Sequence, residues 1–222
     1  MTARAASCMP DSCFCEAVRP TGIRQPSNSA SSLAFVLVAV LVLARGSNKT
    51  IATLFALTLA FVGIGSAYFH ATLSFTGQFF DVLGMYLVAT LALLMSVNRI
   101  RRFGASAMIG LYVLMNALLA IILYTAPEWR RWIFGALLLG IIWAELKDRN
   151  SRKPYLIRAV VVMAIAFIIW IADFTRVLCA PESLVQGHAV WHILGAVAAW
   201  YLYLHCQSFG DDRRTRTAVP GT

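Results

Sequence analysis

The sequence predicts an all-α fold, an integral membrane bundle of seven transmembrane helices. Of its 222 residues, 59% are hydrophobic and only 13% are charged, and the mean hydropathy is +0.72. A soluble domain of this length could not cover so much apolar surface with so few charges. The apolar residues also gather in seven runs, and the connections between the runs hold most of the charges and helix breakers. Together these observations indicate helices that cross a bilayer.

Each run is justified by its length and by the polar connection that follows it. Most runs are close to the roughly 20 residues that a helix needs to span a bilayer, whereas the first and the fifth are shorter. The six connections contain, in order, RGSNK, SFTGQ, NRIRRF, APEWRR, KDRNSRKP and the stretch around RVLCAPES. The runs cover residues 29–45, 50–74, 79–97, 104–124, 131–146, 155–173 and 187–205.

These boundaries divide the chain into three parts. We expect an extracytoplasmic segment at residues 1–28, a transmembrane domain at residues 29–205 and a cytoplasmic tail at residues 206–222. The first segment lacks a charged stretch followed by an apolar stretch and a cleavage site, so we expect no cleaved signal peptide.

The positive charges predict the orientation of the bundle. Six Lys and Arg residues fall on the side of the N-terminus and thirteen on the opposite side. Because basic residues gather on the cytoplasmic side, we expect the N-terminus outside and the C-terminus in the cytoplasm. The membrane would be the inner membrane of a bacterium, or the ER or Golgi membrane of a eukaryote. The same placement in short loops argues against nucleic-acid binding, despite the net charge of +9.

Several polar and ionisable residues share one depth in this arrangement, near the outer leaflet. A membrane segment excludes ionisable side chains unless something compensates for them. Scattered structural residues would not be expected to gather at one level. The residues are Ser66, His70, Asp81, Asp173, His188 and His192, and they come from four of the predicted helices.

Three of the four histidines have the spacing of a metal site. His188 and His192 are an i, i+4 pair, about 6 Å apart along one helix face, and His70 could supply a third nitrogen from another helix. Three histidines with a fourth position open to water form a ligand set of catalytic zinc. Zn²⁺ would compensate for the buried polar groups, and Asp81 would balance its charge or accept a proton. His205 lies about 20 Å further along the last helix, so we do not expect it to be a ligand.

Two of the polar residues have structural alternatives. Ser66 could be a small residue that allows close helix packing together with Gly63 and Gly65. Asp173 could cap its helix or pair with Arg176, and we favour this structural role for it.

The cysteines leave a disulfide open. Cys8, Cys13, Cys15 and Cys179 lie on the predicted outer side, where an oxidising compartment allows disulfides to persist. A bond between the N-terminal segment and Cys179 is compatible with this placement. The sequence does not decide which cysteine pairs with it.

Motifs from most of the chain resemble those of a known family. GSAYFHATLSFTGQFFDVLGMY is similar to an S-x3-H-x10-D block, WIADFTRVLC followed by GHAVWH to a W-x2-D…C…H-x3-H ending, and FCEAV with RQPSNSASSLAF to a C-E…N…S opening. All three are motifs of the alkaline ceramidases. These belong to a superfamily of seven-helix membrane hydrolases that also contains adiponectin-receptor-like and GPI-remodelling proteins.

The resemblance implies a function and roles for five residues. The histidines that match His70, His188 and His192 hold zinc in that family, and the residues that match Asp81 and Ser66 assist the attack of water on the amide of ceramide. The expected substrate is therefore a membrane lipid, and the products are a sphingoid base and a fatty acid. Two alternatives are an ester-cleaving, phospholipase-like hydrolase of the same superfamily and a zinc-containing receptor that is not an enzyme.

The opening motif departs from the family at one position. The animal enzymes bind calcium through D-W-C-E and later acidic residues, whereas here Cys13 replaces the Asp and Glu16 is the obvious acid that remains. Asp11 and Asn28 could contribute further oxygen ligands. Because calcium needs several such ligands, we do not expect a calcium site of the family's kind.

Overall fold

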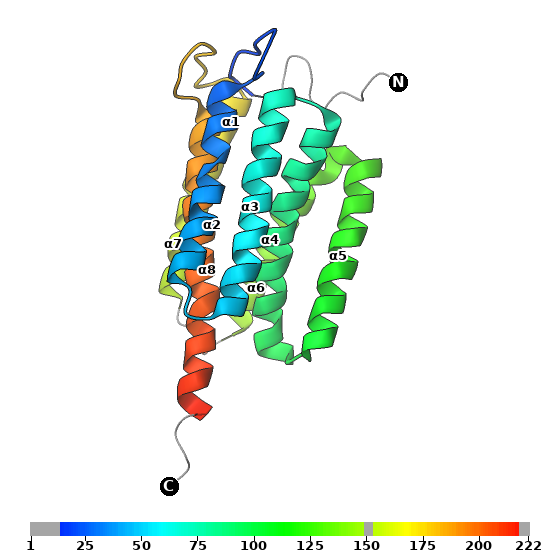
Figure 1. Ribbon diagram of the computed structural model, residues 1–222, viewed down its shortest axis with the longest axis vertical. Helices are drawn as coiled ribbons and strands as arrows, with labels where there is room; N and C mark the ends of the chain where they lie inside the picture. The colour runs from blue at the N-terminus through cyan, green and yellow to red at the C-terminus, as the bar shows by residue number, and fades with distance from the viewer. Residues whose placement is uncertain (1–13, 149–152, 218–222) are drawn as a thin grey trace.

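Every regular element is a helix over the residues that the computed structural model describes, 14–148 and 153–217 (Figure 1). The all-α part of the predicted fold is therefore confirmed. In chain order, the helices are α1 (Pro26–Ser32), α2 (Ala34–Arg45), α3 (Lys49–Thr72), α4 (Phe75–Arg101), α5 (Ala105–Thr125), the 3₁₀ turn η1 (Pro127–Trp129), α6 (Arg130–Lys147), α7 (Pro154–Phe174) and α8 (Gly187–Thr217).

Six of these spans are long and apolar enough to cross a membrane. In this count α1 and α2 form one span over Pro26–Arg45, and the others are α3, α4, α5, α7 and the Gly187–Ser208 part of α8. The helix α6 does not qualify because its apolar stretch is confined between Arg131 and Glu145. The arrangement is consistent with a membrane bundle, and the predicted fifth helix is the one with the weakest apolar signal.

The first predicted helix differs from the structure in its start and in its continuity. It begins at Pro26 and is interrupted at Leu33. Ser31 and Ser32 both donate their hydroxyls to the Asn28 carbonyl, at 3.0 and 2.7 Å, and the Leu33 amide bonds only three residues back. Such side-chain bonds compete with the regular helical pattern, which explains the break.

A further difference concerns the C-terminal end of the chain. The last helix, α8, continues to Thr217, well past the end of the apolar run at residue 205, because hydropathy marks where the apolar stretch ends and not where the helix ends. Cys8, Asp11 and Cys13, which entered the disulfide and calcium expectations, lie outside the described residues.

A close crossing of α3 and α4 at Gly65 brings two predicted site residues together. A Cβ atom added to Gly65 would lie 3.0 Å from the backbone of Phe80, so a larger residue would push the two helices apart by a few tenths of an ångström. Ser66 and Asp81 are the next residues along the two helices. The small residues of α3 therefore position polar neighbours as well as allowing close packing.

Each helix packs closely on only some of the others. The helix α3 packs on α2 and α4, and α4 also packs on α5 and α6, whereas α7 packs mainly along α8. The helices α6 and α7 make few contacts with each other. One core cluster joins α2, α3, α4 and α8, and another joins α4, α5 and α6. Their buried members include Val42, Phe55, Leu59 and Tyr203 in the first, and Val82, Tyr86, Leu123 and Leu137 in the second.

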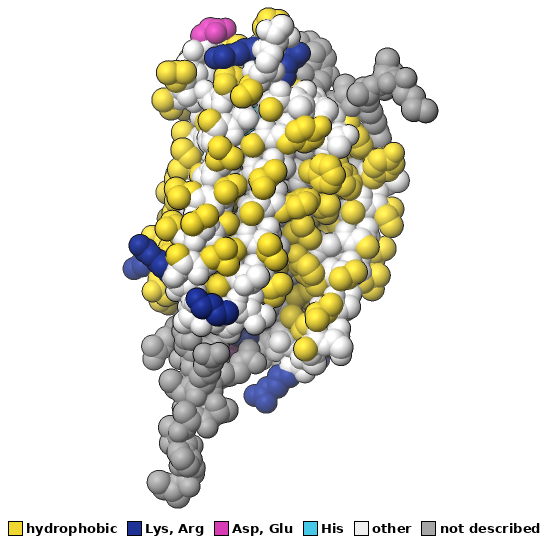
Figure 2. All heavy atoms as spheres, in the orientation of Figure 1, with side chains coloured by type: hydrophobic (Ala, Val, Ile, Leu, Met, Phe, Trp, Pro, Cys, Tyr) yellow, Lys and Arg dark blue, Asp and Glu magenta, His cyan; other side chains and the backbone are white. Residues whose placement is uncertain are grey.

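The outer surface of the bundle is apolar along the helices. Figure 2 shows hydrophobic side chains over its sides and basic side chains towards its two ends. Exposed apolar side chains occur on most helices, and they include Leu37, Ile64, Ile109, Leu139 and Ile168. An apolar surface of this extent fits contact with lipid.

A buried charged network closes the end of the bundle opposite Phe14. Nε2 of His205 lies 2.9 Å from Oε2 of Glu145, and the Ser96 hydroxyl donates to Oε1 of Glu145 at 2.6 Å. Arg99 pairs with the same carboxylate and, through Nε at 3.1 Å, with Asp148. The network links α4, α6 and α8.

Candidate metal centre and active site

Three histidines meet inside the bundle at the end where Phe14 lies. His70 stands near the end of α3, and His188 and His192 stand in the first turns of α8. Nitrogen atoms of the three rings lie within 4.8 Å of one another, and the side chains are only 0 to 5% exposed. The structure therefore brings together the three residues that the sequence proposed as metal ligands.

The hydrogen bonds of the rings leave some nitrogens facing the centre of the group. Nδ1 of His70 lies 2.9 Å from Oε1 of Gln25, and Nδ1 of His192 lies 2.9 Å from Oγ of Ser31. Nε2 of His70 and Nδ1 of His188 have no hydrogen-bond partner among the described residues. Buried ring nitrogens normally have a hydrogen-bond partner or a metal ion, so these two atoms are candidate ligand atoms for a metal.

A divalent transition metal fits this donor set. Imidazole ligands suit zinc, copper, iron and nickel, and a ligating histidine usually bonds a protein group through its other ring nitrogen. His70 and His192 show that second bond, to Gln25 and Ser31. The donor set alone does not select one metal.

Asp173 fixes the start of α8 and therefore two of the three histidines. Its Oδ2 accepts a hydrogen bond from the His188 amide at 3.1 Å, and its Oδ1 accepts one from the Cys15 amide at 3.1 Å. A Cβ atom on Gly187 would lie 2.8 Å from Cβ of Asp173, so this close contact requires glycine. These contacts agree with the structural role expected for Asp173. They go beyond the expected helix cap, because the carboxylate accepts hydrogen bonds from the backbone of two other segments.

The N-terminal segment covers the histidines. Cys15 forms a disulfide with Cys179, which resolves the pairing that the sequence left open. The Phe14 ring stacks on His188 with centroids 3.7 Å apart. The Glu16 carboxylate accepts hydrogen bonds from the amides of Ser27 and Asn28, at 2.7 and 2.9 Å, and so holds the beginning of α1.

Ser66 and Asp81 lie beside the histidines. Oγ of Ser66 is 3.4 Å from Nε2 of His192 and 3.1 Å from Oγ of Ser32. The Asp81 carboxyl interacts with the Ser66 hydroxyl and with the charge of Arg130. Asp81 is half-buried, and its side chain lines a cavity.

Several residues around this site were not assigned a role from the sequence. Gln25, Ser31 and Ser32 contact the histidine rings or Ser66, and Phe14 covers the site. The resemblance of RQPSNSASSLAF to a family motif is the signal that marked this segment. It did not reveal the contacts, because they join α1 to residues about 40 to 160 positions away.

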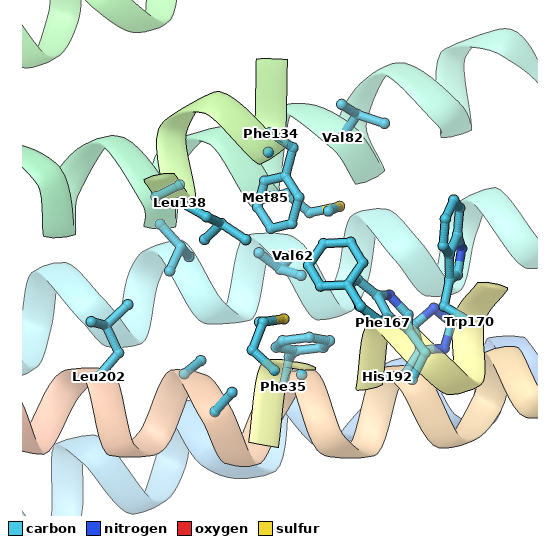
Figure 3. A pocket seen from close by; sticks show the side chains of 18 of the residues that line it. Phe35, Val62, Val82, Met85, Phe134, Leu138, Phe167, Trp170, His192 and Leu202 are labelled. Atoms are coloured by element: carbon cyan, nitrogen blue, oxygen red, sulfur yellow. The ribbon is translucent and has the colours of Figure 1, made fainter. Parts of the chain in front are cut away.

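An apolar cavity of about 490 Å³ opens from the site and runs along the bundle. Side chains of α2, α3, α4, α6, α7 and α8 line it, and Figure 3 shows several of them, from His192 and Trp170 at one end to Leu202 at the other. Leu202 is about 15 Å from His192 along α8 at 1.5 Å per residue. The polar lining residues are gathered at the end of the cavity where the histidines lie: Ser66, Gln78, Asp81, Arg130, Arg131, His188 and His192.

The fold and the site together define a helical, membrane-type bundle with an internal three-histidine centre and an apolar cavity. The sequence matches the Ceramidase family model over residues 14–218. This protein therefore belongs to the ceramidase family.

Individual relatives support the same family assignment. The chain is 30% identical over 172 residues to the Putative alkaline ceramidase dcd3B of Dictyostelium discoideum, covering 65% of this chain and 59% of the relative. It is 31% identical over 157 residues to the Alkaline ceramidase of Drosophila melanogaster (64% and 54%), and 27% identical over 153 residues to Alkaline ceramidase 1 of Mus musculus (63% and 55%). The matches span less than two thirds of the length of these relatives.

Proposed function

We propose that this protein is a zinc-dependent amidohydrolase that cleaves ceramide, or a closely related lipid, into a sphingoid base and a fatty acid. The observation that carries the proposal is the joining of a three-histidine centre to an apolar cavity of about 490 Å³ with one carboxyl group, Asp81, at their junction. Membership of the ceramidase family supports the same reaction. His70, His188 and His192 would hold the metal ion, which supplies Lewis-acid activation when bound.

The side chains around the metal centre suit the hydrolysis of an amide. Asp81 would accept a proton from the attacking water and pass it to the amine nitrogen as the carbon–nitrogen bond breaks, which leaves a free amine and a carboxylic acid. The Ser66 hydroxyl would donate a hydrogen bond to the oxygen of the scissile carbonyl as negative charge develops on it. The apolar walls would hold the acyl chains, and Phe14 would limit the access of water to the site.

The orientation and number of membrane crossings also remain proposals. We propose seven crossings, with the site facing the extracytoplasmic leaflet and the end of α8 in the cytoplasm. The Cys15–Cys179 disulfide supports this side for the site, because disulfides persist in oxidising compartments. A fluorescent reporter that matures only in the cytoplasm, fused after Thr222, tests the orientation.

Purified protein tests the reaction directly. Metal analysis should find about one zinc ion per chain, and mass spectrometry of a panel of ceramides and phospholipids should show amide cleavage. Asp81→Asn should keep the metal and lower turnover by about 10²- to 10⁴-fold, the usual contribution of a positioned general base. Cleavage of esters alone would replace the amidase by a phospholipase-like enzyme. Zinc binding without turnover of any lipid would favour a receptor.

A further inference from the structure

One face of α4 lines the cavity from its polar end into its apolar part. Gln78 and Asp81 come first on this face, and Val82, Met85 and Ala89 follow at helical spacing. At 1.5 Å per residue, Gln78 lies about 4.5 Å from Asp81 along the helix axis. It stands on the side of Asp81 that is away from the apolar residues.

The packing of α4 on α3 fixes the position of Gln78. A Cβ atom added to Gly77 would lie 2.7 Å from Cα of Phe69, so the first turn of α4 packs against the residue next to His70. The Ser74 hydroxyl accepts the Gly77 amide at 3.1 Å, and the Ser74 carbonyl accepts the Gln78 amide at 3.0 Å. Ser74 therefore caps the helix, and the buried side chain of Gln78 is not needed for that cap.

Gln78 is the polar residue of the cavity wall that brings hydrogen bonds without charge and has no part in the proposed reaction. Ser66, the other neutral one, would serve the scissile carbonyl. The guanidinium of Arg130 donates to the Pro127 carbonyl at 2.8 Å, and that of Arg131 lies over aromatic rings of α7. A glutamine amide has two N–H donors and an acceptor oxygen, so it can bind a ligand hydroxyl in addition to a protein partner.

The shape of a ceramide places one hydroxyl group on the side of Gln78. In the proposed enzyme the scissile amide lies at Asp81, and both tails follow the apolar walls towards Leu202. The terminal hydroxyl of the sphingoid base lies close to the amide and on the opposite side of it from the two tails. It would therefore point back towards the start of α4, where Gln78 lines the cavity.

We propose that Gln78 binds the terminal hydroxyl of the sphingoid base and selects lipids that carry this hydroxyl over lipids that lack it. A site that hydrogen-bonds a substrate hydroxyl discriminates against the analogue without it, because the buried partner is then left unpaired. The inference rests on the proposed function for the identity of the substrate. It can be tested without turnover, because it also predicts a preference in binding.

The alternative is a purely structural role for Gln78 where α3 and α4 meet, and Gln186 provides a matched control for it. Gln186 is also buried and stands at the same end of the bundle, just before α8, but it does not line the cavity. Its Nε2 donates to the carbonyls of Ala180, Pro181 and Ser183. Replacing Gln186 removes a buried amide near the histidines and leaves the cavity wall intact.

The experiment compares the wild-type protein with Gln78→Met, Gln78→Glu and Gln186→Met, all loaded with zinc in lipid nanodiscs. Methionine keeps the size of glutamine without its hydrogen bonds, and glutamate keeps an acceptor for the hydroxyl. Native mass spectrometry measures the binding of two uncleavable ceramide analogues of equal chain length, one with the terminal hydroxyl and one with a methyl group in its place. The kcat/KM values for a ceramide and for the same ceramide without its terminal hydroxyl are measured in parallel.

We expect the wild-type protein to bind the hydroxyl analogue about tenfold more tightly than the methyl analogue. Gln78→Met should abolish this preference by weakening the binding of the hydroxyl analogue alone. Gln78→Glu should keep most of the preference, and Gln186→Met should keep it in full. The ratio of the kcat/KM values should follow the same pattern. A binding preference that depends on Gln78, without turnover of any lipid, would support the subsite and refute the proposed enzyme.

Equal binding of the two analogues by the wild-type protein would overturn the subsite, even if ceramide is cleaved, and this measurement requires no variant. A preference that Gln78→Met retains would overturn the assignment to Gln78. Equal losses for both analogues in Gln78→Met, or the same change of preference in Gln186→Met, would show a structural residue and would also refute the proposal.

Discussion

The main-chain amide of His188 donates a hydrogen bond to Oδ2 of Asp173 at 3.1 Å. The other oxygen of the same carboxylate accepts the amide of Cys15 at 3.1 Å. One buried side chain therefore joins the end of α7, the start of α8 and the segment that covers the histidines. The position of two candidate metal ligands depends on it.

Replacing Asp173 should weaken both the fold and the metal centre. Asp173→Ala leaves two buried amides without an acceptor, which should lower the free energy of unfolding by about 2–5 kcal/mol. Asp173→Asn keeps the shape and one acceptor oxygen, so its loss should be smaller. Thermal unfolding in detergent, with metal content measured on the same samples, checks both effects. An alanine variant with wild-type stability and metal content would contradict this role.

The histidines should differ in their effect on metal content. His192→Ala removes one of three grouped rings and should lower bound zinc from about one per chain to a small fraction of that. His205→Gln provides the control, because His205 contacts Glu145 at the other end of the bundle. It should keep the metal and lose some stability, since the buried Glu145 carboxylate loses one of its partners. Inductively coupled plasma analysis of both purified variants makes the comparison.

Gln25 should tune the metal centre without being a ligand. Its Oε1 lies 2.9 Å from Nδ1 of His70 and fixes the orientation of that ring. Gln25→Leu should weaken zinc binding by about 10- to 100-fold, as losses of such supporting contacts usually do. Gln25→Glu keeps the acceptor and should retain most of the affinity. Zinc titration against a competing chelator measures both, and equal affinities for the leucine variant and the wild-type protein would refute the role.

Loss of the Cys15–Cys179 disulfide should destabilise the cover over the histidines. Cys15→Ser and Cys179→Ser should each lower the free energy of unfolding by about 2–4 kcal/mol, and a reductant should lower the stability of the wild-type protein by a similar amount. Cys206 is buried and free, so Cys206→Ala should keep its full response to the reductant. Unfolding curves with and without reductant test this, and a wild-type curve unaffected by the reductant would count against it.

The helices and the histidine group could be predicted because both depend on repeating patterns. Apolar runs mark helices of membrane length, and the direction of each run placed His70 at the same depth as His188 and His192. The break at Leu33 was not predicted, because it arises from bonds of Ser31 and Ser32 that a hydropathy pattern does not contain.

The supporting contacts of the site could not be predicted for a different reason. Gln25 and Ser31 reach rings on α3 and α8, and no periodic signal links residues so far apart. The cavity that α6 and α7 help to line likewise depends on how the helices pack and not on the composition of either one.

If the cavity holds the lipid tail of the proposed substrate, the charged network at the far end of the bundle would limit the length of that tail. Ile142 and Leu202 line the cavity, and Glu145 and His205 follow them by one helical turn. A tail that extended beyond these residues would have to separate a buried carboxylate from its imidazole and guanidinium partners. In the proposed enzyme the ion network would act as a fixed stop for the tail, and replacing its side chains by smaller ones, more than reshaping the apolar walls, would be the way to admit longer chains.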